Sequence, residues 1–518
     1  MTNFFKDNPD IDFHLTHGDW DEVIRLKEAD FSDAGIYADA PFDAQDAIDG
    51  YRHVLDLVGE IAGEQIAPRS ADVDEEGSVL EGGKVRYAAG IQAAIRELSQ
   101  ADLMGITLPR RYGGLNMPTF VYNLAIEMIS QGDASLMTIF GLQDIAETIY
   151  EFASDEIKDH YLPKFCNGEV TGAMVLTEPD AGSDLQAVAL RAHEDTENSC
   201  WRLNGVKRFI SNGCGHVLLV LARSEPGSAT ARGLSLLICE QGPTVKIRRL
   251  EKKLGIRGSP TCEIQFMNTP AQLIGQRKRG LTQYVMALMN GARIGIAGQG
   301  VGIAQAAYNA AMSFAEAREQ FGKKIKDMPP VRNMLAEMKT QIEAARALNM
   351  RTAVEVDLDR YLGDQLESGK ITERERLDEL KARHIHAKRC AAMLTPMSKL
   401  LATEMCQYVT TTAIQVHGGS GYMKDYPVER YFRDARITNI YEGTSELQVV
   451  AAILGVTSGT LMKFLSDLDK PVDGKVDPDL LDALRDHVKK MEKSIAEYNQ
   501  QDEAFRQLYA RDLVDTAM

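Results

Sequence analysis

The chain lacks an excess of positive charge. It has 58 Lys and Arg against 75 Asp and Glu, a net charge of −17 over 518 residues. Proteins that bind nucleic acid neutralise its phosphates with basic side chains, so this balance argues against nucleic acid and against an anionic membrane surface as partners. An anionic ligand would need a local cluster of basic residues for its binding. Arg318, Lys323 and Lys324 are candidates for it, with ordinary surface charges as the alternative.

Long hydrophobic runs and ordered cysteine patterns are missing too. The longest strongly apolar stretch, residues 216–222, is too short to cross a bilayer. The N-terminal residues show no basic region followed by an apolar segment, as a secretory signal would. The seven cysteines are irregularly spaced without a C-x-x-C pair, which favours free thiols in a reducing compartment. These absences predict a cytoplasmic protein without a membrane span.

The chain does have enough apolar sequence for two or three domains, since 44% of its residues are hydrophobic. Apolar residues recur at helical spacing from about 51 to 165 and again from 280. The long helices expected in the second region cover residues 281–319, 328–357, 373–415 and 445–456. Six short β-rich runs separated by turn residues lie between the two regions, at 172–176, 201–210, 216–222, 234–239, 245–250 and 262–266. This order predicts an α+β fold.

Three segments fit this scheme less well. Residues 1–50 are acidic and hard to place, with loop and a short helix expected over 31–41. Residues 358–384 form a charged insertion of the kind that becomes a surface loop or a helix extension. Residues 458–518 contain two helical patterns, 478–489 and 491–513.

The C-terminal patterns need apolar partners. We expect their hydrophobic side chains to pack against the rest of the chain or a neighbouring subunit, with the insertion as a further partner, and to cover no chemistry. The side chains concerned are Met491, Ile495, Phe505 and Leu508. The last residues show no helix cap, which predicts a longer polypeptide.

Residues 440–448 read Ile-Tyr-Glu-Gly-Thr-Ser-Glu-Leu-Gln and single out Glu442. A carboxylate between an aromatic residue and a glycine, just before a new helix, sits on backbone that can approach a ligand closely. Thr444 or Ser445 can cap that helix. The plainer interpretation is a solvated acid in a first helical turn, favoured by the helix dipole.

Four further segments accompany this one in order. They read Leu-Thr-Glu-Pro-Asp-Ala-Gly-Ser-Asp-Leu at 176–185, Lys-Arg-Phe-Ile-Ser-Asn-Gly at 207–213, Arg-Glu-Gln-Phe-Gly-Lys-Lys-Ile at 318–325 and Gln-Val-His-Gly-Gly-Ser-Gly-Tyr at 415–422. Together, over roughly residues 50–457, the chain resembles the acyl-CoA dehydrogenase family of flavoproteins. The insertion and the C-terminal extension resemble those of larger bacterial members.

The resemblance implies an acyl-CoA dehydrogenase fold. Its parts would be an N-terminal extension (1–50), an N-terminal α-domain (51–168), a middle β-domain (169–275), a C-terminal helical bundle (276–457, with the insertion 358–384) and extra C-terminal helices (458–518). The chain would act in fatty acid metabolism by β-oxidation, as a homodimer or homotetramer.

The implied reaction is α,β-dehydrogenation of an acyl-CoA thioester with FAD as cofactor. Glu442 would remove the α-proton while a hydride leaves the β-carbon for flavin N5, since no side chain accepts hydrides. The Glu442 backbone N–H would grip the thioester carbonyl. In one branch of the family the base lies just before an arginine of the helix after the β-domain; Ala292 stands there and cannot accept a proton. Electrons would pass to an electron-transfer flavoprotein.

Other site residues follow from the same resemblance. Leu176, Thr177, Phe209 and Ser211 would lie at the flavin ring. Arg318, Gln320, Phe321, Gln415 and Gly419 would reach the FAD of a neighbouring subunit. Thr444 and Glu446 would complete the cofactor site, and Ser183, Arg293, Tyr441 and Gly443 would contact the acyl-CoA substrate.

Several alternatives stay open. Arg293 can be half of an ordinary helix salt bridge, Thr177 and Ser183 can be turn residues, and Phe209 can be a buried strand residue. At the level of function, an acyl-CoA oxidase, a flavin monooxygenase and a non-enzymatic flavin-binding paralogue are the rivals. His384 and His386 could bind a metal, but no ligand spacing supports a metal site.

Overall fold

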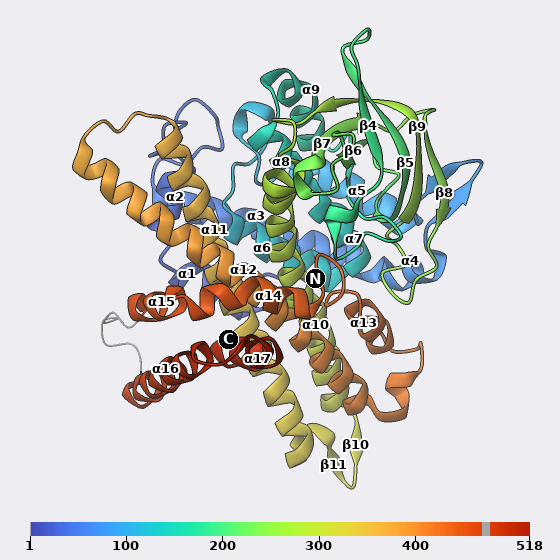
Figure 1. Cartoon of the computed structure of the whole chain (residues 1–518). Helices are drawn as coiled ribbons and strands as arrows, with labels where there is room; N and C mark the ends of the chain where they lie inside the picture. Colours follow the sequence, from blue (N-terminus) through green and yellow to red (C-terminus); the bar gives the residue numbers. More distant parts are fainter. Residues whose placement is uncertain (1, 469–476) are drawn as a thin grey trace.

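The computed structural model describes residues 2–468 and 477–518, and it divides into helices, a sheet and further helices (Figure 1). The predicted α+β order is confirmed. The element sequence is in keeping with the proposed domain limits near residues 169 and 276. The helices of the first part are α1 (Pro9–His17), α2 (Asp21–Lys27), α3 (Ala44–Glu60), α4 (Ser70–Glu76), α5 (Ala89–Gln100), α6 (Thr119–Gly132), α7 (Ala134–Phe140), α8 (Asp144–Phe152) and α9 (Asp155–Cys166). A small hairpin of β1 (Val79–Glu81) and β2 (Lys84–Arg86) lies among them.

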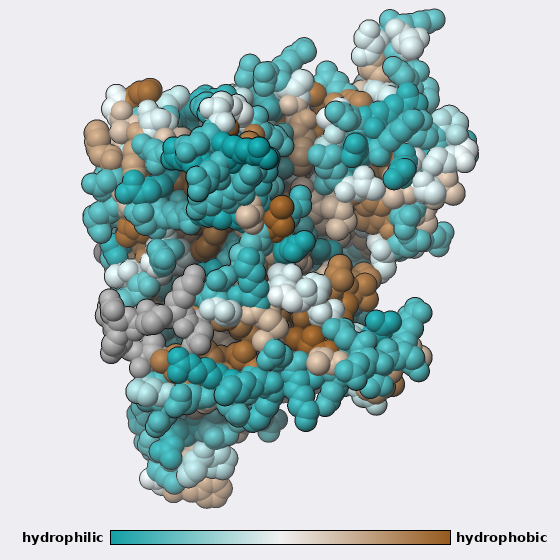
Figure 2. Space-filling model, turned by 60° about the vertical axis from the view of Figure 1, so that its left-hand side comes forward, coloured by the Kyte–Doolittle hydropathy of each residue, from teal (hydrophilic) through white to brown (hydrophobic). Residues whose placement is uncertain are grey.

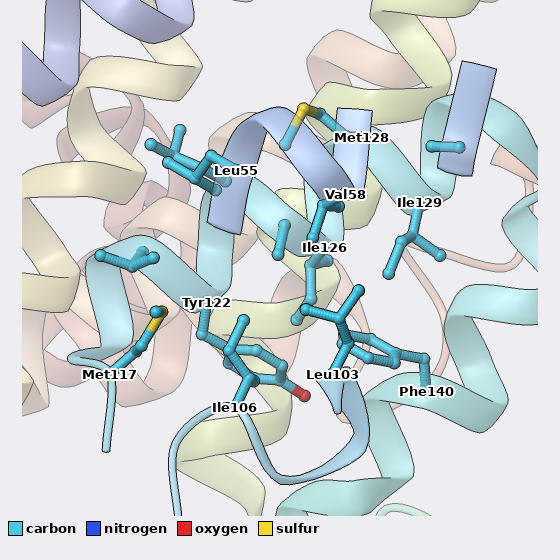
Figure 3. Packing of buried hydrophobic residues seen from close by; sticks show 14 of the residues in the cluster. Leu55, Val58, Leu103, Ile106, Met117, Tyr122, Ile126, Met128, Ile129 and Phe140 are labelled. Atoms are coloured by element: carbon cyan, nitrogen blue, oxygen red, sulfur yellow. The ribbon is translucent and has the colours of Figure 1, made fainter. Parts of the chain in front are cut away.

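Helix α6 forms the centre of this first part. Every residue after its first is buried. Leu55 and Val58 of α3 lie in one apolar cluster with Ile126 and Met128 of α6 (Figure 3). This helix also carries a buried carboxylate, Glu127, which pairs with buried Arg346 of α11 at 2.7 Å. An ion pair so withdrawn from water must be well matched, because each charge would otherwise be buried alone. The pair therefore fixes the first part against the later helices.

The middle part is a seven-stranded mixed sheet. Its strands are β3 (Gly172–Val175), β4 (Arg191–Asp195), β5 (Cys200–Ser211), β6 (Val217–Arg223), β7 (Leu234–Glu240), β8 (Val245–Leu250) and β9 (Thr261–Leu273). Five of them pair in a closed circuit, in the order β6, β4, β5, β9, β7 and back to β6. The six predicted runs are confirmed. The prediction missed β4, because only one of its five residues is buried and no apolar alternation marks it.

Long helices return after the sheet. They are α10 (Met286–Ala317), α11 (Pro329–Glu367), α12 (Arg374–His417), α13 (Val428–Ala435) and α14 (Ser445–Thr457). A π-helical turn, Gly280–Val285, leads into α10. A two-stranded hairpin of β10 (Glu319–Gln320) and β11 (Lys323–Lys324) follows α10. The four predicted helices are confirmed, and α11 and α12 run further than predicted.

The insertion and the N-terminal segment, both hard to place from the sequence, lie against each other. Residues 358–367 extend α11 and residues 374–384 extend α12, so the insertion is mostly helix. Leu362 and Leu380 of these extensions are buried, and Leu26 of α2 packs against their cluster. The short helix expected over 31–41 is wrong, since those residues form turns. Helices α1 and α2 were missed because each is short and buries only two residues.

The C-terminal extension packs against α12 and α14. Its helices are α15 (Thr460–Leu468), α16 (Pro478–Asn499) and α17 (Glu503–Ala517). Met491 and Ile495 of α16 share a buried cluster with Met393 of α12 and Val449 of α14, which confirms the predicted docking. Phe505 and Leu508 stay exposed, at 39% and 72%, so they are not among the docking residues. The predicted helix break near residue 490 is wrong: α16 continues to Asn499, and Asp502 caps α17.

Charged and polar residues cover most of the surface. From one side the molecule is largely hydrophilic, and hydrophobic residues show mainly in a recess across its middle (Figure 2). Within residues 2–468 and 477–518, no single helix is long and apolar enough to cross a membrane; only the bent pair α14 and α15, at 72° to each other, reaches that length and composition jointly.

Candidate active site

The loop between α13 and α14 carries Glu442 on an unusual backbone. Glu442 has φ +53° and Gly443 has φ +95°, two consecutive left-handed residues. A residue with a side chain adopts this conformation only at a cost of about 1–3 kcal/mol, so the surrounding structure must hold it. Two features favour glycine at position 443. Its φ is positive, and a Cβ there would lie 2.6 Å from Gln448 Nε2.

Three helices supply the hydrogen bonds that hold this turn. The Glu442 carbonyl accepts from Arg293 Nε of α10 at 3.3 Å and from Gln448 Nε2 of α14 at 3.1 Å. The Gly443 carbonyl accepts from Lys399 Nζ of α12 and again from Gln448 Nε2, both at 2.8 Å. We call Arg293, Lys399 and Gln448 the clamp. Since they belong to three separate helices, the turn is fixed by tertiary packing and not by its own sequence.

The Glu442 carboxyl is withdrawn into this arrangement. Burial raises its pKa above the ordinary value, and the positive charges of Arg293 and Lys399 pull the pKa back down. Desolvation disfavours a carboxylate, whereas nearby cations favour it. The interpretation of Glu442 as a solvated first-turn acid is therefore wrong. A raised pKa makes the carboxylate a stronger base, which suits a general base.

Tyr441 anchors the loop from the other side. Its hydroxyl pairs with Gln299 of α10, whose Nε2 donates to the Ala134 carbonyl at 3.1 Å. Burial raises the pKa of Tyr441, so it stays a neutral phenol. Tyr441 was expected at the substrate; its hydroxyl is already occupied by Gln299.

The residues after Gly443 start α14. Thr444 stands at the N-cap position, but its side chain makes no capping hydrogen bond, and Ser445 Oγ instead donates to Glu404 of α12. Side-chain capping by either residue was therefore wrong. Glu446 is exposed and pairs with Arg511 of α17 at 3.1 Å. The extension thus contacts Glu446, one of the residues expected at the cofactor.

Arg293 resolves one alternative. Its side chain donates to Asn290 Oδ1 at 3.1 Å and to the Glu442 carbonyl, and it is only 8% exposed. Among the residues that the structure describes, its hydrogen bonds go to these neutral oxygens, so it is not half of an ordinary helix salt bridge.

A second group lies where the segment that follows β3 is hydrogen-bonded to β5. Lys207 Nζ donates to the Leu176 carbonyl at 2.6 Å, and Arg208 N donates to the Thr177 carbonyl at 3.0 Å. These bonds bring Leu176 and Thr177 next to Phe209 and Ser211 on β5.

Phe209 is not a buried strand residue. It has φ +63° and is 50% exposed, with the Arg208 guanidinium 4.6 Å from the centre of its ring. Ser183 is exposed on the loop that folds back on Thr177, where a Cβ on Gly182 would lie 4.0 Å from the Thr177 methyl. Leu176 and Leu288 at the start of α10 belong to one apolar cluster, which links this group to the helix carrying Arg293.

A third group lies at the opposite end of α10. The residues expected to reach a cofactor of another subunit are all exposed there: Arg318, Gln320, Phe321, Gln415 and Gly419. Phe321 is 95% exposed at the tip of the β10–β11 hairpin (Figure 1). Stacking of Phe314 on His417, with ring centres 4.3 Å apart, joins the ends of α10 and α12. A helix rises 1.5 Å per residue, so Arg318 is roughly 37 Å along α10 from Arg293.

Sequence reasoning missed most of the supporting residues. Lys399 is fully buried within an apolar stretch of α12, and a lone lysine in such a stretch is a signal that could have been used. Gln448, Gln299 and Glu404 give no such signal, because polar residues on long helices are common. The two histidines of the insertion pair with carboxylates, His384 with Asp359 and His386 with Asp467. No group of three metal-binding side chains occurs in the described chain.

Three family models match consecutive parts of the chain. They are the N-terminal domain of acyl-CoA dehydrogenase over residues 49–169, its middle domain over 173–269 and its C-terminal domain over 294–446. The N-terminal segment and the C-terminal extension lie outside these matches.

Curated relatives are identical to this chain at about a third of the aligned positions. An acryloyl-CoA reductase (NADH) of Anaerotignum propionicum is 37% identical over 361 residues, covering 68% of this chain and 84% of the relative. An acyl-CoA dehydrogenase of Bacillus subtilis is 36% identical over 361 residues, covering 68% and 86%. A 3-methylmercaptopropionyl-CoA dehydrogenase of Ruegeria pomeroyi is 33% identical, covering 77% and 69%.

Solved structures agree with these matches. Butyryl-CoA dehydrogenase of Megasphaera elsdenii is 29% identical, with a TM-score of 0.67 over 80% of this chain and 98% of its own. A glutaryl-CoA dehydrogenase in complex with glutaryl-CoA is 28% identical, with a TM-score of 0.65 over 77% and 92%.

Proposed function

Because the chain belongs to the acyl-CoA dehydrogenase family and is thus an oxidoreductase, we propose that it converts an acyl-CoA thioester to the trans-2-enoyl-CoA with FAD. The observation that carries the proposal is Glu442 itself: a half-buried residue whose carboxyl has a raised pKa, on a strained turn held by three helices. Strain of this kind, held by surrounding structure, is typical of functional sites.

Glu442 is the proposed base for the α-proton. The α-proton of a thioester is only weakly acidic, so the base must be placed close to it and must share it at working pH. Ala292, at the alternative base position, has no group that accepts a proton. Glu442 is therefore the supported candidate.

The proposed site for the thioester carbonyl is the backbone of the same turn. In the described part of the chain, the N–H groups of Glu442 and Gly443 donate to no protein acceptor. Free N–H groups beside the base can receive the oxygen on which negative charge develops as the proton leaves. The clamp keeps them in place, because it holds the two carbonyls of the turn.

The residues of the β3–β5 group fit a flavin. Phe209 leaves half of a flat apolar ring uncovered, and Ser211 follows it on β5. The carbonyls of Leu176 and Thr177 accept hydrogen bonds from Lys207 and Arg208 of the same strand. When bound, the flavin supplies the acceptor for the hydride from the substrate β-carbon. Thr444 and Glu446 are proposed as further cofactor-binding residues. Ser183 is proposed at the CoA part of the substrate, with Arg293, Tyr441 and Gly443 around the reacting end.

The electron acceptor is proposed to be an electron-transfer flavoprotein, in the cytoplasm and within β-oxidation. An intact Glu442 argues against the monooxygenase and the non-enzymatic paralogue, neither of which needs a base there. One relative carries the name of a reductase, so both reaction directions belong in the test.

The test is anaerobic flavin bleaching. Protein loaded with FAD is mixed with a panel of saturated acyl-CoA esters, with free CoA as the control. We expect at least one ester to bleach the flavin and free CoA to leave it oxidised. Air admitted afterwards separates the rivals, because a dehydrogenase stays reduced far longer than an oxidase. Protein that binds FAD but is bleached by no acyl-CoA, and reoxidised from the reduced form by no enoyl-CoA, would refute the proposal.

A further inference from the structure

Lys399 contacts no reacting group in the proposed chemistry, yet it is among the largest fully buried side chains of the molecule. It lies on α12 between buried Met397 and Leu400. Its Nζ donates to the Gly443 carbonyl at 2.8 Å. An ammonium in such a place costs free energy unless charges and hydrogen bonds compensate it. The chain thus keeps a cation under the turn at a cost to its stability.

The charged groups facing Lys399 come from two neighbouring elements, the Glu442 turn and α10, and from α12 itself, which carries Glu404. Burial lowers its pKa to about 7, Glu442 and Glu404 raise it, and Arg293 lowers it. Glu404 also accepts from Ser445 Oγ, so part of its charge is directed to the start of α14. Glu442 is therefore the main carboxylate partner of the ammonium, although the direct hydrogen bond goes to the next residue's carbonyl.

We propose that Lys399 is a positioning residue for Glu442, fixing the left-handed turn through the Gly443 carbonyl and favouring the carboxylate form of the base. The inference rests on the proposed function of Glu442. Within the clamp the three members differ: Gln448 is neutral, Arg293 binds the Glu442 carbonyl, and Lys399 binds the following one. Lys399 differs from both, because it carries a positive charge near Glu442 and its own pKa lets it lose that charge near neutral pH.

The direction of the expected effect follows from charge. A carboxylate that loses a nearby cation becomes harder to ionise, so its pKa rises. A base with a higher pKa is protonated, and inactive, over a wider acidic range. Removing the Lys399 charge must therefore move the acidic limb of the rate profile to higher pH.

The test measures the rate of anaerobic flavin reduction against pH for wild type and Lys399→Met, both loaded with FAD. We expect the acidic limb to move up by about one pH unit, and the rate on that limb to fall about tenfold. Lys399→Arg, which keeps a cation, should restore the limb towards the wild-type position. A purely structural role would lower FAD content or the melting temperature without moving the limb.

A matched control is present in the same chain. Lys27 of α2 is half-buried, its pKa is lowered to about 8 by burial, and its Nζ donates to the Thr107 carbonyl at 3.0 Å. Lys27→Met removes the same kind of group far from Glu442. It should cost stability and leave the pH profile unchanged.

Glu442→Gln is measured in parallel to separate the two claims. An inactive Glu442→Gln with an unmoved limb in Lys399→Met would overturn the role of Lys399 and leave the proposed function intact. A Glu442→Gln variant that reduces its flavin at the wild-type rate would overturn the function instead. If Lys399→Met does not fold, Lys399→Arg decides: a limb displaced upward despite the retained cation would overturn the inference.

Discussion

The two ends of α10 serve the proposed site in opposite ways. At its first turns, Arg293 is buried and hydrogen-bonded to the Glu442 turn, which α12 and α14 hold as well. After its last turn, Arg318 and the hairpin that follows are exposed, with Phe321 95% open to solvent. At the first end, the residues that hold the Glu442 turn all come from the same chain. The second presents its side chains outward.

The buried and exposed ends of α10 indicate how the cofactor site is divided. Roughly 37 Å of helix separates Arg293 from Arg318, far more than an arginine side chain can span. If both belong to cofactor sites, they cannot serve the same one within a single chain. We therefore propose that each FAD lies between two chains, one giving the Glu442 turn and the β3–β5 group, the other giving Arg318, Gln320, Phe321, Gln415 and Gly419.

The largest effect should come from removing the charge of Glu442, whose turn is held at the buried end of α10. Glu442→Gln keeps the shape of the side chain and removes its charge. Loss of a positioned base typically lowers the rate by about 10²–10⁴-fold, so flavin reduction by acyl-CoA should fall at least that far. FAD content and subunit assembly should stay as in wild type. Glu497→Gln, on the surface of α16, is the control. Near wild-type bleaching by Glu442→Gln would refute the assignment.

Removing the side chain of Arg318, at the exposed end of α10, should have a smaller and different effect. A hydrogen bond to a charged group contributes about 1.5–3 kcal/mol, so Arg318→Ala should weaken FAD binding roughly 10- to 100-fold. Because that arginine would reach a neighbouring chain's phosphate, assembly should weaken with FAD loss. Equilibrium dialysis and light scattering measure the two quantities. Arg374→Ala, an exposed arginine at the start of α12, should change neither. A wild-type protein that is monomeric with its full FAD content would contradict the shared site.

The smallest effect should come from the C-terminal extension. Arg511 pairs with exposed Glu446 just after the buried turn. Exposed pairs contribute about 0–1 kcal/mol, so Arg511→Ala should change FAD affinity and the bleaching rate by no more than about fivefold. Rate and affinity are compared at low and high salt, because salt screens such a pair. A loss as large as that of Arg318→Ala would mean that the extension belongs to the site itself.

The sequence predicted the parts of the fold whose signals are local. The apolar runs of β5 to β8 and the helical period of α10, α11, α12 and α14 can be recognised in the sequence. β4 has one buried residue and gives no such signal. The partnership of α2 with the insertion could not be predicted either, because it joins residues more than 300 positions apart. It depends on Leu26 meeting Leu362 and Leu380 across space.

The candidate site shows the same limit. The motif singled out Glu442, and Gly443 was recognised as a close-approach glycine. Nothing in residues 440–448 says that Lys399 and Arg293 lie beneath them, since those contacts arise from the packing of three helices. The exposure of Phe209 could not be read from the strand pattern, because it depends on the left-handed backbone at that residue.

The most direct test of the divided site is complementation between two inactive chains. Glu442→Gln and Arg318→Ala chains are co-expressed with different tags, hybrids are isolated, and bleaching is measured at limiting FAD. If each site uses two chains, one site of a hybrid dimer carries both defects and the other carries neither. We expect hybrids to regain about half of the wild-type activity. Hybrids no more active than a mixture of the two parent proteins would contradict it.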